Sequence, residues 1–154
     1  LDPMIPIYLM DQYKMTPAAI EKLLIKESGL LGVSGVSNDM RDLEASTDKN
    51  SQLAIDLFVS MLAQQTGAAM ASIQGLDGIV FTAGIGERSP LIRAKACAAL
   101  GWAGVVIDPA LNEIKNDAAR RISSEQSQIE VWVIPTDEES VIARDTWKLC
   151  AALG

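Results

Sequence analysis

The chain has 154 residues, 49% of them hydrophobic and 21% charged, and a formal net charge of −7. This composition fits one folded domain of ordinary size and excludes an intrinsically disordered chain. The acidic balance without a basic block argues against nucleic-acid partners and anionic membrane surfaces, and no apolar run reaches the roughly 20 residues of a membrane span.

The histidine and cysteine content limits the catalytic, metal-binding and disulfide chemistry that we expect, and the first residue bears on the length of the protein. The chain has no histidine, which removes the commonest general base and the commonest zinc ligand. Its two cysteines, Cys97 and Cys150, are far apart, so we expect buried, unreactive thiols, no disulfide and a cytoplasmic location. Because the chain starts at Leu1, we expect a piece of a longer protein.

The first half of the chain predicts mainly helices. Apolar residues favour a helix at 4–12, and a Thr-Pro pair is typical of a helix start at 16–27. Three glycines and three serines predict irregular backbone at 28–37. An Asn-Asp pair opens a short helix within 38–43, and helical spacing of apolar residues predicts a long helix over 50–73.

The second half of the chain alternates strand-like and helix-like segments, which favours a sheet with crossover helices. Strands are expected at 79–82, 105–107 and 129–134, with a minor strand at Ile122. Helices are expected at 89–100, 108–116 and 136–151.

The stretch FTAGIGERSP, residues 81–90, places two glycines between a predicted strand and a predicted helix. Glycine at Gly84 and Gly86 removes the side chains that would keep a ligand away from the backbone. The motif is weak by itself, because the third position of a dinucleotide fingerprint is Ser89 and the sequence has no Gly-Lys-Ser/Thr phosphate loop. A tight structural turn without a ligand explains it equally well.

Three stretches together are more specific than the glycine turn. They are GLLGVSGVSNDMRDLE (29–44), IVFTAGIGERSPLIRAKACAALG (79–101) and VIPTDEESVIARDT (133–146), and they resemble the acetate kinase family in motif, order and spacing. The resemblance covers nearly the whole chain.

The resemblance implies an α/β fold, a ribonuclease-H-like lobe as in actin, Hsp70 and the sugar kinases. Such a lobe has a mixed sheet with crossover helices, here with a helical N-terminal half. Residues 1–154 would form a single nucleotide-binding C-terminal lobe of a two-lobed kinase. The N-terminal lobe, absent from this chain, would bind the short-chain carboxylate and supply the catalytic residues, so we expect no catalytic residue here.

The resemblance also implies an adenosine site at the glycine turn, formed by Gly84, Ile85, Gly86, Glu87 and Arg88. Two positions depart from the family pattern. The family usually has glycine where Ala83 stands, and asparagine or histidine where Arg88 stands. The long charged side chain of Arg88 would reach a phosphate or project into water.

Asp39, Met40 and Arg41 match a family Asp-x-Arg motif that contacts the nucleotide. The thioether of Met40 would lie against the base, the carboxylate of Asp39 would accept bonds from the ribose or hold the arginine, and Arg41 would contact nucleotide groups. The alternative is a helix cap at Asp39 with a surface arginine.

Glu138 matches the family glutamate that helps to hold magnesium, a cation that prefers carboxylate and water oxygens. The alternative is purely structural, because Thr136 and Glu139 have the spacing of a capping box at a helix start. Asp137 replaces the usual family asparagine and adds negative charge there.

The implied activity is that of acetate kinase, the reversible transfer of the γ-phosphoryl group of ATP to acetate, giving acetyl phosphate and ADP with Mg²⁺ as cofactor. This chain by itself would bind nucleotide without turnover, and the family implies a homodimer. Two alternatives stay open: a fragment of a propionate or butyrate kinase, or a non-catalytic lobe for ATP binding or dimerisation.

Overall fold

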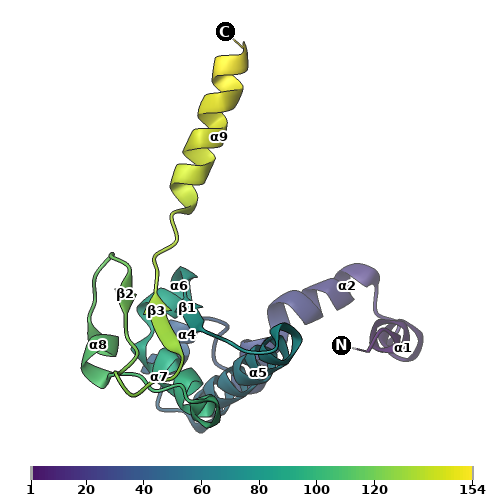
Figure 1. Ribbon diagram of the computed structural model, residues 1–154. Coiled ribbons are helices and arrows are strands. Elements are labelled where there is room, and N and C mark those ends of the chain that lie inside the picture. The colour runs from purple at the N-terminus through teal and green to yellow at the C-terminus, as the bar shows by residue number, and fades with distance from the viewer. Residues whose placement is uncertain (1, 154) are drawn as a thin grey trace. The chain divides into compact units, whose positions relative to one another are not determined.

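The computed structural model describes residues 2–153, without the side chains of residues 138, 152 and 153. The chain divides into two compact units, Leu1–Gln64 and Gln65–Gly154, with the boundary inside the long helix α5, Lys49–Ile73 (Figure 1). The expectation that all residues form a single lobe stays a prediction.

The first unit is helical throughout its described secondary structure, as predicted. Its elements are α1 (Met4–Tyr13), α2 (Pro17–Lys22), the π-helical segment η1 (Leu23–Glu27), α3 (Gly29–Ser34), α4 (Met40–Ala45) and the first part of α5. The Thr16 hydroxyl accepts a hydrogen bond from the backbone N–H of Ala19 at 3.2 Å, so the predicted Thr-Pro helix start is confirmed.

The prediction of irregular backbone at 28–37 is wrong, because α3 occupies most of it. Two of the glycines stand at the two ends of this helix and do not interrupt it. Gly29 has φ +61° at its first position, and Gly35, with φ +64°, ends it in the left-handed conformation that favours glycine. The Ser34 hydroxyl accepts bonds from the N–H groups of Val36 and Ser37, which would otherwise lack partners at the turn.

The second unit contains the sheet and the helices that cross over it. After the last part of α5 come β1 (Gly78–Phe81), α6 (Ala83–Arg88), α7 (Pro90–Ala99), the 3₁₀ turn η2 (Gly101–Ala103), α8 (Pro109–Glu113), β2 (Arg120–Arg121), β3 (Glu130–Val133) and α9 (Glu138–Leu153). The strand order is β1-β3-β2. Strand β1 pairs with β3 in parallel, and β2 pairs with β3 antiparallel.

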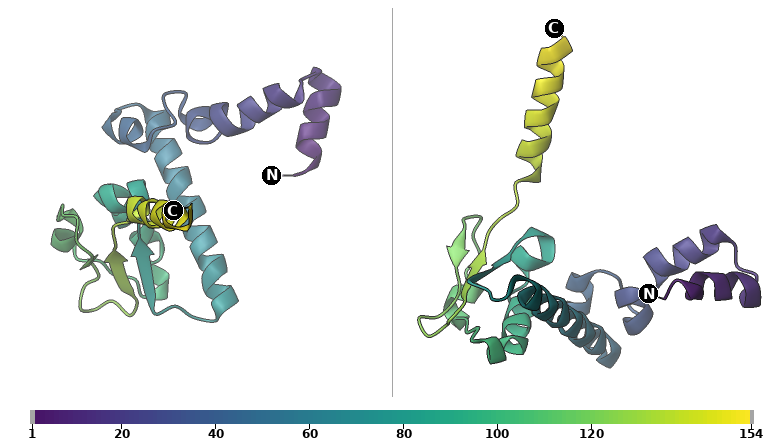
Figure 2. Two further views of the ribbon diagram at one scale, coloured as in Figure 1. Left: turned by 90° about the horizontal axis from the view of Figure 1, so that it is seen from above. Right: turned by 45° about the vertical axis from the view of Figure 1, so that its right-hand side comes forward.

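A parallel pair needs a long crossover connection, and here α6, α7 and α8 lie between β1 and β3 in the sequence. Both views of Figure 2 show β1 and β3 side by side. The predicted α/β class with a small mixed sheet and crossover helices is therefore confirmed. The finer ribonuclease-H-like assignment stays a prediction.

Some of the predicted elements in this unit differ from the structure. The minor strand expected at Ile122 is displaced, because β2 covers Arg120–Arg121 and ends just before Ile122. The segment 105–107 is not a strand, and only Ile107 forms an isolated bridge, with Ser123. Its pairing stops early because Asp108 already caps α8, accepting bonds from the N–H groups of Ala110 and Leu111. A short helix, α6, precedes the helix expected from Ser89, and Gly84 and Gly86 lie inside it and not in a turn between strand and helix.

Helix α7 contributes four buried residues to the second unit, Ile92, Arg93, Ala96 and Cys97, and strand β3 contributes Val131 and Val133. Along β3, Val131 and Val133 are fully buried while Glu130 is exposed, the alternation expected of a strand with one covered face. Burial of such aliphatic side chains contributes about 1.5–3 kcal/mol each. Helix α5 has 25 residues, yet neither it nor another described helix combines the length and hydropathy needed to cross a membrane.

Candidate functional site

The carboxyl ends of the parallel strands β1 and β3 bring two threonines together. Thr82 follows β1 and Thr136 follows β3 by three residues, and their hydroxyl groups hydrogen bond to each other. The Thr136 hydroxyl also accepts a bond from the N–H of Ala83, at 3.1 Å. This contact joins the start of α6 to the segment after β3, which places both at one edge of the sheet.

Glu87 makes a second connection between α6 and the same segment. Its carboxylate accepts a hydrogen bond from the backbone N–H of Thr136 at 2.8 Å. That bond is the main cause of the lowered pKa of Glu87. The negatively charged Glu87 side chain therefore links α6, which follows β1, to the segment that follows β3. The sequence pattern gave Thr136 a different role, as the first residue of a capping box.

A pocket of about 400 Å³ opens beside these contacts. It is lined by residues from the start and end of α6 and from the segment that leads into α9: Ala83, Gly84, Glu87, Arg88, Thr136, Asp137 and Glu139. Three of the predicted adenosine residues, Gly84, Glu87 and Arg88, are among them. Ile85 and Gly86 belong to the same helix but do not line this pocket.

The two glycines of the motif are needed for different reasons. A Cβ at Gly84 would meet no described atom within 4 Å, so the bare backbone faces open space next to the pocket. A Cβ at Gly86 would lie 3.3 Å from the backbone carbonyl carbon of Phe81 and 3.5 Å from its Cα. Gly86 thus lets α6 pack closely on β1. Gly84 leaves its backbone open to solvent, so a ligand has room to approach it.

Ala83 stands in a backbone conformation that favours glycine, with φ +58°. The left-handed turn at Ala83 lets the chain leave β1 and enter α6 directly. Glycine would adopt this φ without the strain that a Cβ causes, so the positive φ explains a preference for glycine at this position, and Ala83 bears that strain.

Arg93 is a residue of this region that the sequence analysis missed. It is 1% exposed, and its Nη1 donates to the carbonyl oxygens of Gly86 and Glu87, both at 2.9 Å. On the other side its Nε and Nη2 donate to Asn112, at 2.7 Å to Oδ1 and 2.6 Å to the carbonyl oxygen. Arg93 therefore ties the end of α6 to α8. The sequence signal was an arginine on the apolar stripe of α7, between Ile92 and Ala96.

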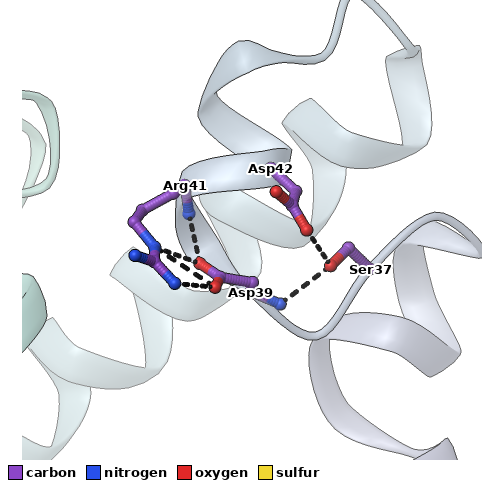
Figure 3. Close-up of polar contacts among 4 residues, drawn as sticks. All are labelled: Ser37, Asp39, Arg41 and Asp42. Carbon is purple, nitrogen blue, oxygen red and sulfur yellow. Dashed lines mark hydrogen bonds and ion pairs between the residues drawn. The ribbon is translucent and has the colours of Figure 1, made fainter.

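The Asp-x-Arg motif lies in the first unit, at the start of α4. Asp39 accepts a hydrogen bond from the backbone N–H of Arg41, at 2.9 Å, and further bonds from the Arg41 guanidinium (Figure 3). These bonds, the side-chain bond first, lower the pKa of Asp39 to about 2. Ser37 supports the turn, accepting from the N–H of Asp39 and donating to Asp42. The alternative reading of Asp39 as a helix cap is thus confirmed, because its carboxylate caps α4.

The remaining members of the motif differ in exposure. The side chain of Arg41 is 81% exposed and free to meet a ligand with its outer edge, whereas Met40 is 4% exposed. The nucleotide contacts assigned to Asp39, Met40 and Arg41 stay predictions.

Glu138 is the first residue of α9, and its side chain lies outside the described part of the structure. The predicted capping box is wrong. Asp137 is the residue that caps α9, its carboxylate accepting from the N–H of Ser140 at 3.0 Å, because Thr136 is already bonded to Thr82 and Ala83. Among the described residues no three acidic or cysteine side chains gather as a metal-ligand cluster.

The cysteines also differ from expectation in one respect. Both are free thiols, and Cys97 is buried, which raises its pKa to about 12, chiefly by desolvation. Cys150, expected to be buried, is exposed on α9.

Comparisons with known proteins agree on one family. The sequence profile of the acetokinase family matches residues 1–144. The acetate kinase of Rhodopseudomonas palustris strain TIE-1 is 48% identical over 149 residues, which are 97% of this chain and 37% of that protein. The acetate kinase of Dictyoglomus turgidum is 45% identical, covering 95% of this chain and 36% of that protein.

Solved structures give the same result. The crystal structure of Porphyromonas gingivalis acetate kinase matches with a TM-score of 0.84 and 36% identity, over 97% of this chain and 38% of that one. A propionate kinase from Francisella tularensis matches with a TM-score of 0.79 and 36% identity, over 90% of this chain and 36% of that one. The chain thus spans little more than a third of the length of the curated relatives it matches, 37% in the first case.

Proposed function

Because the chain belongs to the acetokinase family, we propose that it forms the nucleotide-binding part of an acetate kinase. The reaction is the reversible transfer of the γ-phosphoryl group of ATP to acetate, giving acetyl phosphate and ADP. The likeness to acetate kinases over 97% of this chain supports the proposal. The chain covers 37% of such a relative, so binding of nucleotide is the share of the activity assigned to it.

The open backbone at Gly84 is the observation that carries this assignment. It lies at the carboxyl edge of a parallel strand pair, the edge at which open α/β sheets bind ligands, and it borders a pocket of about 400 Å³. We assign the adenosine to this pocket, flat against Gly84. Among the described lining residues, Glu87, Asp137 and Glu139 are acidic and Arg88 alone is cationic, so an uncharged nucleoside suits the pocket better than bare phosphates do.

Magnesium fits the same edge of the sheet. Mg²⁺ usually takes one or two protein carboxylates and completes its shell with water and substrate phosphates. Glu138 is proposed as the ligand, and the carboxylates of Asp137 and Glu139 stand next to it in the sequence, both on exposed residues. When bound with nucleotide, the ion would neutralise charge on the phosphates during transfer. Asp137 is already engaged as a helix cap, which favours a neighbour as the ligand.

The finer fold and the setting follow from the family as proposals. We propose a ribonuclease-H-like lobe of a two-lobed kinase, supported by the parallel β1–β3 pair and its helical crossover. The proposed compartment is the cytoplasm, supported by two free thiols. A homodimer is proposed as the assembly.

Calorimetric titration of the 154-residue chain with Mg²⁺ and ADP tests the nucleotide site. Gly84→Val should weaken binding at least tenfold, because the new side chain fills the space assigned to adenosine. Gly67→Val is the matched control: it also replaces a helical glycine whose Cβ position is open within 4 Å, away from the pocket. Equal ADP affinity in wild type and Gly84→Val would show that adenosine does not bind against Gly84.

A propionate kinase is the second candidate, since one of the solved structures carries that name at the same 36% identity. The residues that select the acid are expected outside this chain, as is the catalytic machinery. A non-catalytic ATP-binding lobe is the third candidate.

We predict that the isolated chain yields no acyl phosphate from ATP with acetate, propionate or butyrate in a hydroxamate assay. Steady acetyl phosphate formation would contradict this.

A further inference from the structure

A second pocket, of about 420 Å³, lies between the end of α6, the start of α7 and the segment from α8 to β2. It meets the nucleotide pocket at two residues, Glu87 and Arg88, which line both. Its wall consists of Glu87, Arg88, Pro90, Arg93, Ile114, Lys115, Asn116, Asp117, Arg120, Val133 and Pro135. The nucleotide proposal makes no use of this second pocket.

The wall of the pocket is cationic on an acidic protein. It carries three arginines and one lysine against two carboxylates, a formal balance of +2 (four minus two), whereas the whole chain carries −7. No ion pair with another described residue involves any of these four cations. Of the two carboxylates, Glu87 already accepts a bond from the N–H of Thr136. The pocket therefore has positive charge without a paired anion.

Two of the guanidinium groups lie close enough to repel each other. The positive charge of Arg120 adds to burial in lowering the pKa of Arg93. All hydrogen-bond acceptors of Arg93 are uncharged: the carbonyl oxygens of Gly86 and Glu87, and the side chain and carbonyl of Asn112. The negative charge of Glu113 acts on this pKa in the opposite sense. Because none of the described hydrogen bonds of Arg93 goes to a carboxylate, an anion in the adjoining pocket would offset the cost of burying this cation.

Arg120 also has a donor that no described group satisfies. Its Nε is buried and has no hydrogen-bond partner in the described residues. Its Nη1 makes two contacts of 3.3 Å, to the carbonyl oxygen and Oδ1 of Asn116, at the long end of the hydrogen-bond range. An unsatisfied buried donor in a native structure often marks an ion or water that occupies the site. A small rotation of Arg120 would present its planar fork to such an ion.

We propose that this pocket binds a phosphate-like oxyanion through Arg120 and Lys115, at a site separate from the nucleotide pocket. Arginine recognises tetrahedral oxyanions through paired N–H donors, and a dianion matches the excess of two positive charges. Val133 in the wall is fully buried, and low polarity beside the cations strengthens their attraction for an anion. The proposal goes beyond nucleotide binding by this chain and does not depend on it.

Titration of the 154-residue chain with inorganic phosphate, at constant ionic strength set with chloride, tests the proposal. Wild type should show saturable binding, and Arg120→Gln should weaken it at least tenfold. Arg121→Gln is the matched control, because Arg121 is the next residue on β2, faces Glu130 at 3.6 Å and does not line the pocket. Lys115→Gln, which changes an exposed side chain, gives the same test if Arg120→Gln folds poorly. Absence of saturable binding, or equal loss in Arg121→Gln, would overturn the proposal.

A second arm separates free phosphate from the phosphates of a nucleotide. Phosphate affinity should be the same within twofold with and without saturating Mg²⁺ and ADP, and it should survive Gly84→Val. Loss of phosphate binding on addition of ADP would show that one ligand uses both pockets and would end the claim of a separate site. If ADP does not bind at all while phosphate binding still depends on Arg120, the nucleotide proposal fails and this one stands.

Discussion

At the scale of single residues, the Asp39–Arg41 contact shows how one carboxylate serves two purposes. Its oxygen caps α4 through the backbone N–H of Arg41, and it pairs with the exposed guanidinium of the same residue. The folded-state pKa of about 2 lies below the ordinary 3.8. The contribution of Asp39 to stability is therefore complete above pH 3.8 and is lost as the pH falls through about 2.

Arg41→Gln separates the two interactions of Asp39. The side-chain bond to Arg41 is the largest cause of the lowered pKa, and the backbone bond is the second. The variant loses the first and keeps the second, so the pKa of Asp39 should rise part of the way from about 2 toward 3.8. Carboxyl ¹³C chemical shifts followed against pH measure this. Lys49→Gln removes a cation that takes no part in the described hydrogen bonds of Asp39, so it should leave this pKa unchanged. An unmoved pKa in Arg41→Gln would contradict the assignment.

At the scale of elements, helix starts and strand periodicity were predictable because their causes are local. Ser89 accepts from the N–H of Ile92 at the start of α7, as its place before Pro90 predicts. The period-two burial of Val131 and Val133 is visible in the sequence IEVWVI. Neither requires knowledge of a distant residue.

The contacts that build the candidate site could not be predicted in the same way. Thr82 and Thr136 are 54 positions apart and meet only because β1 and β3 pair in parallel. Arg93 and Asn112 are 19 positions apart and meet through the packing of α7 on α8. The spacing of residues 136–139 predicted a capping box that begins at Thr136. This prediction failed because sequence spacing does not reveal that Thr136 bonds to Thr82 and Ala83. The two motif glycines looked equivalent for the same reason.

The packing of α6 on β1 predicts opposite effects for alanine at the two glycines. Gly86→Ala should lower the free energy of unfolding by about 1–3 kcal/mol, because its Cβ meets the backbone of Phe81 at 3.3 Å and neither element can yield easily. Gly84→Ala should be neutral or raise it by up to about 1 kcal/mol, because the space is open and alanine favours a helix.

Urea denaturation of both variants beside wild type measures the pair. The comparison is internal, since both changes add one methyl group to the same six-residue helix. Equal destabilisation by the two alanines would mean that helix α6 does not pack on β1 through Gly86.

At the scale of the whole molecule, exposed apolar side chains point to association. On α1, Met4, Ile7 and Tyr8 are exposed, Tyr8 at 55%, and on α9 Trp147 is exposed at 77%. Apolar side chains gathered on one helix often mark an interface. The proposed homodimer assigns such an interface to the helical first unit, in which α1 packs against α2.

Sedimentation equilibrium of the 154-residue chain tests the dimer and its face together. Wild type should sediment with the mass of two chains of 16.5 kDa each, because a shared apolar surface leaves water on association. Tyr8→Glu places a charge within that surface and should raise the dissociation constant at least tenfold. Trp147→Glu makes the same change at a similarly exposed site on α9 and should leave the mass unchanged. If Trp147→Glu and not Tyr8→Glu yields monomers, the interface lies on the second unit, and a monomeric wild type at high concentration would reject the homodimer for this chain.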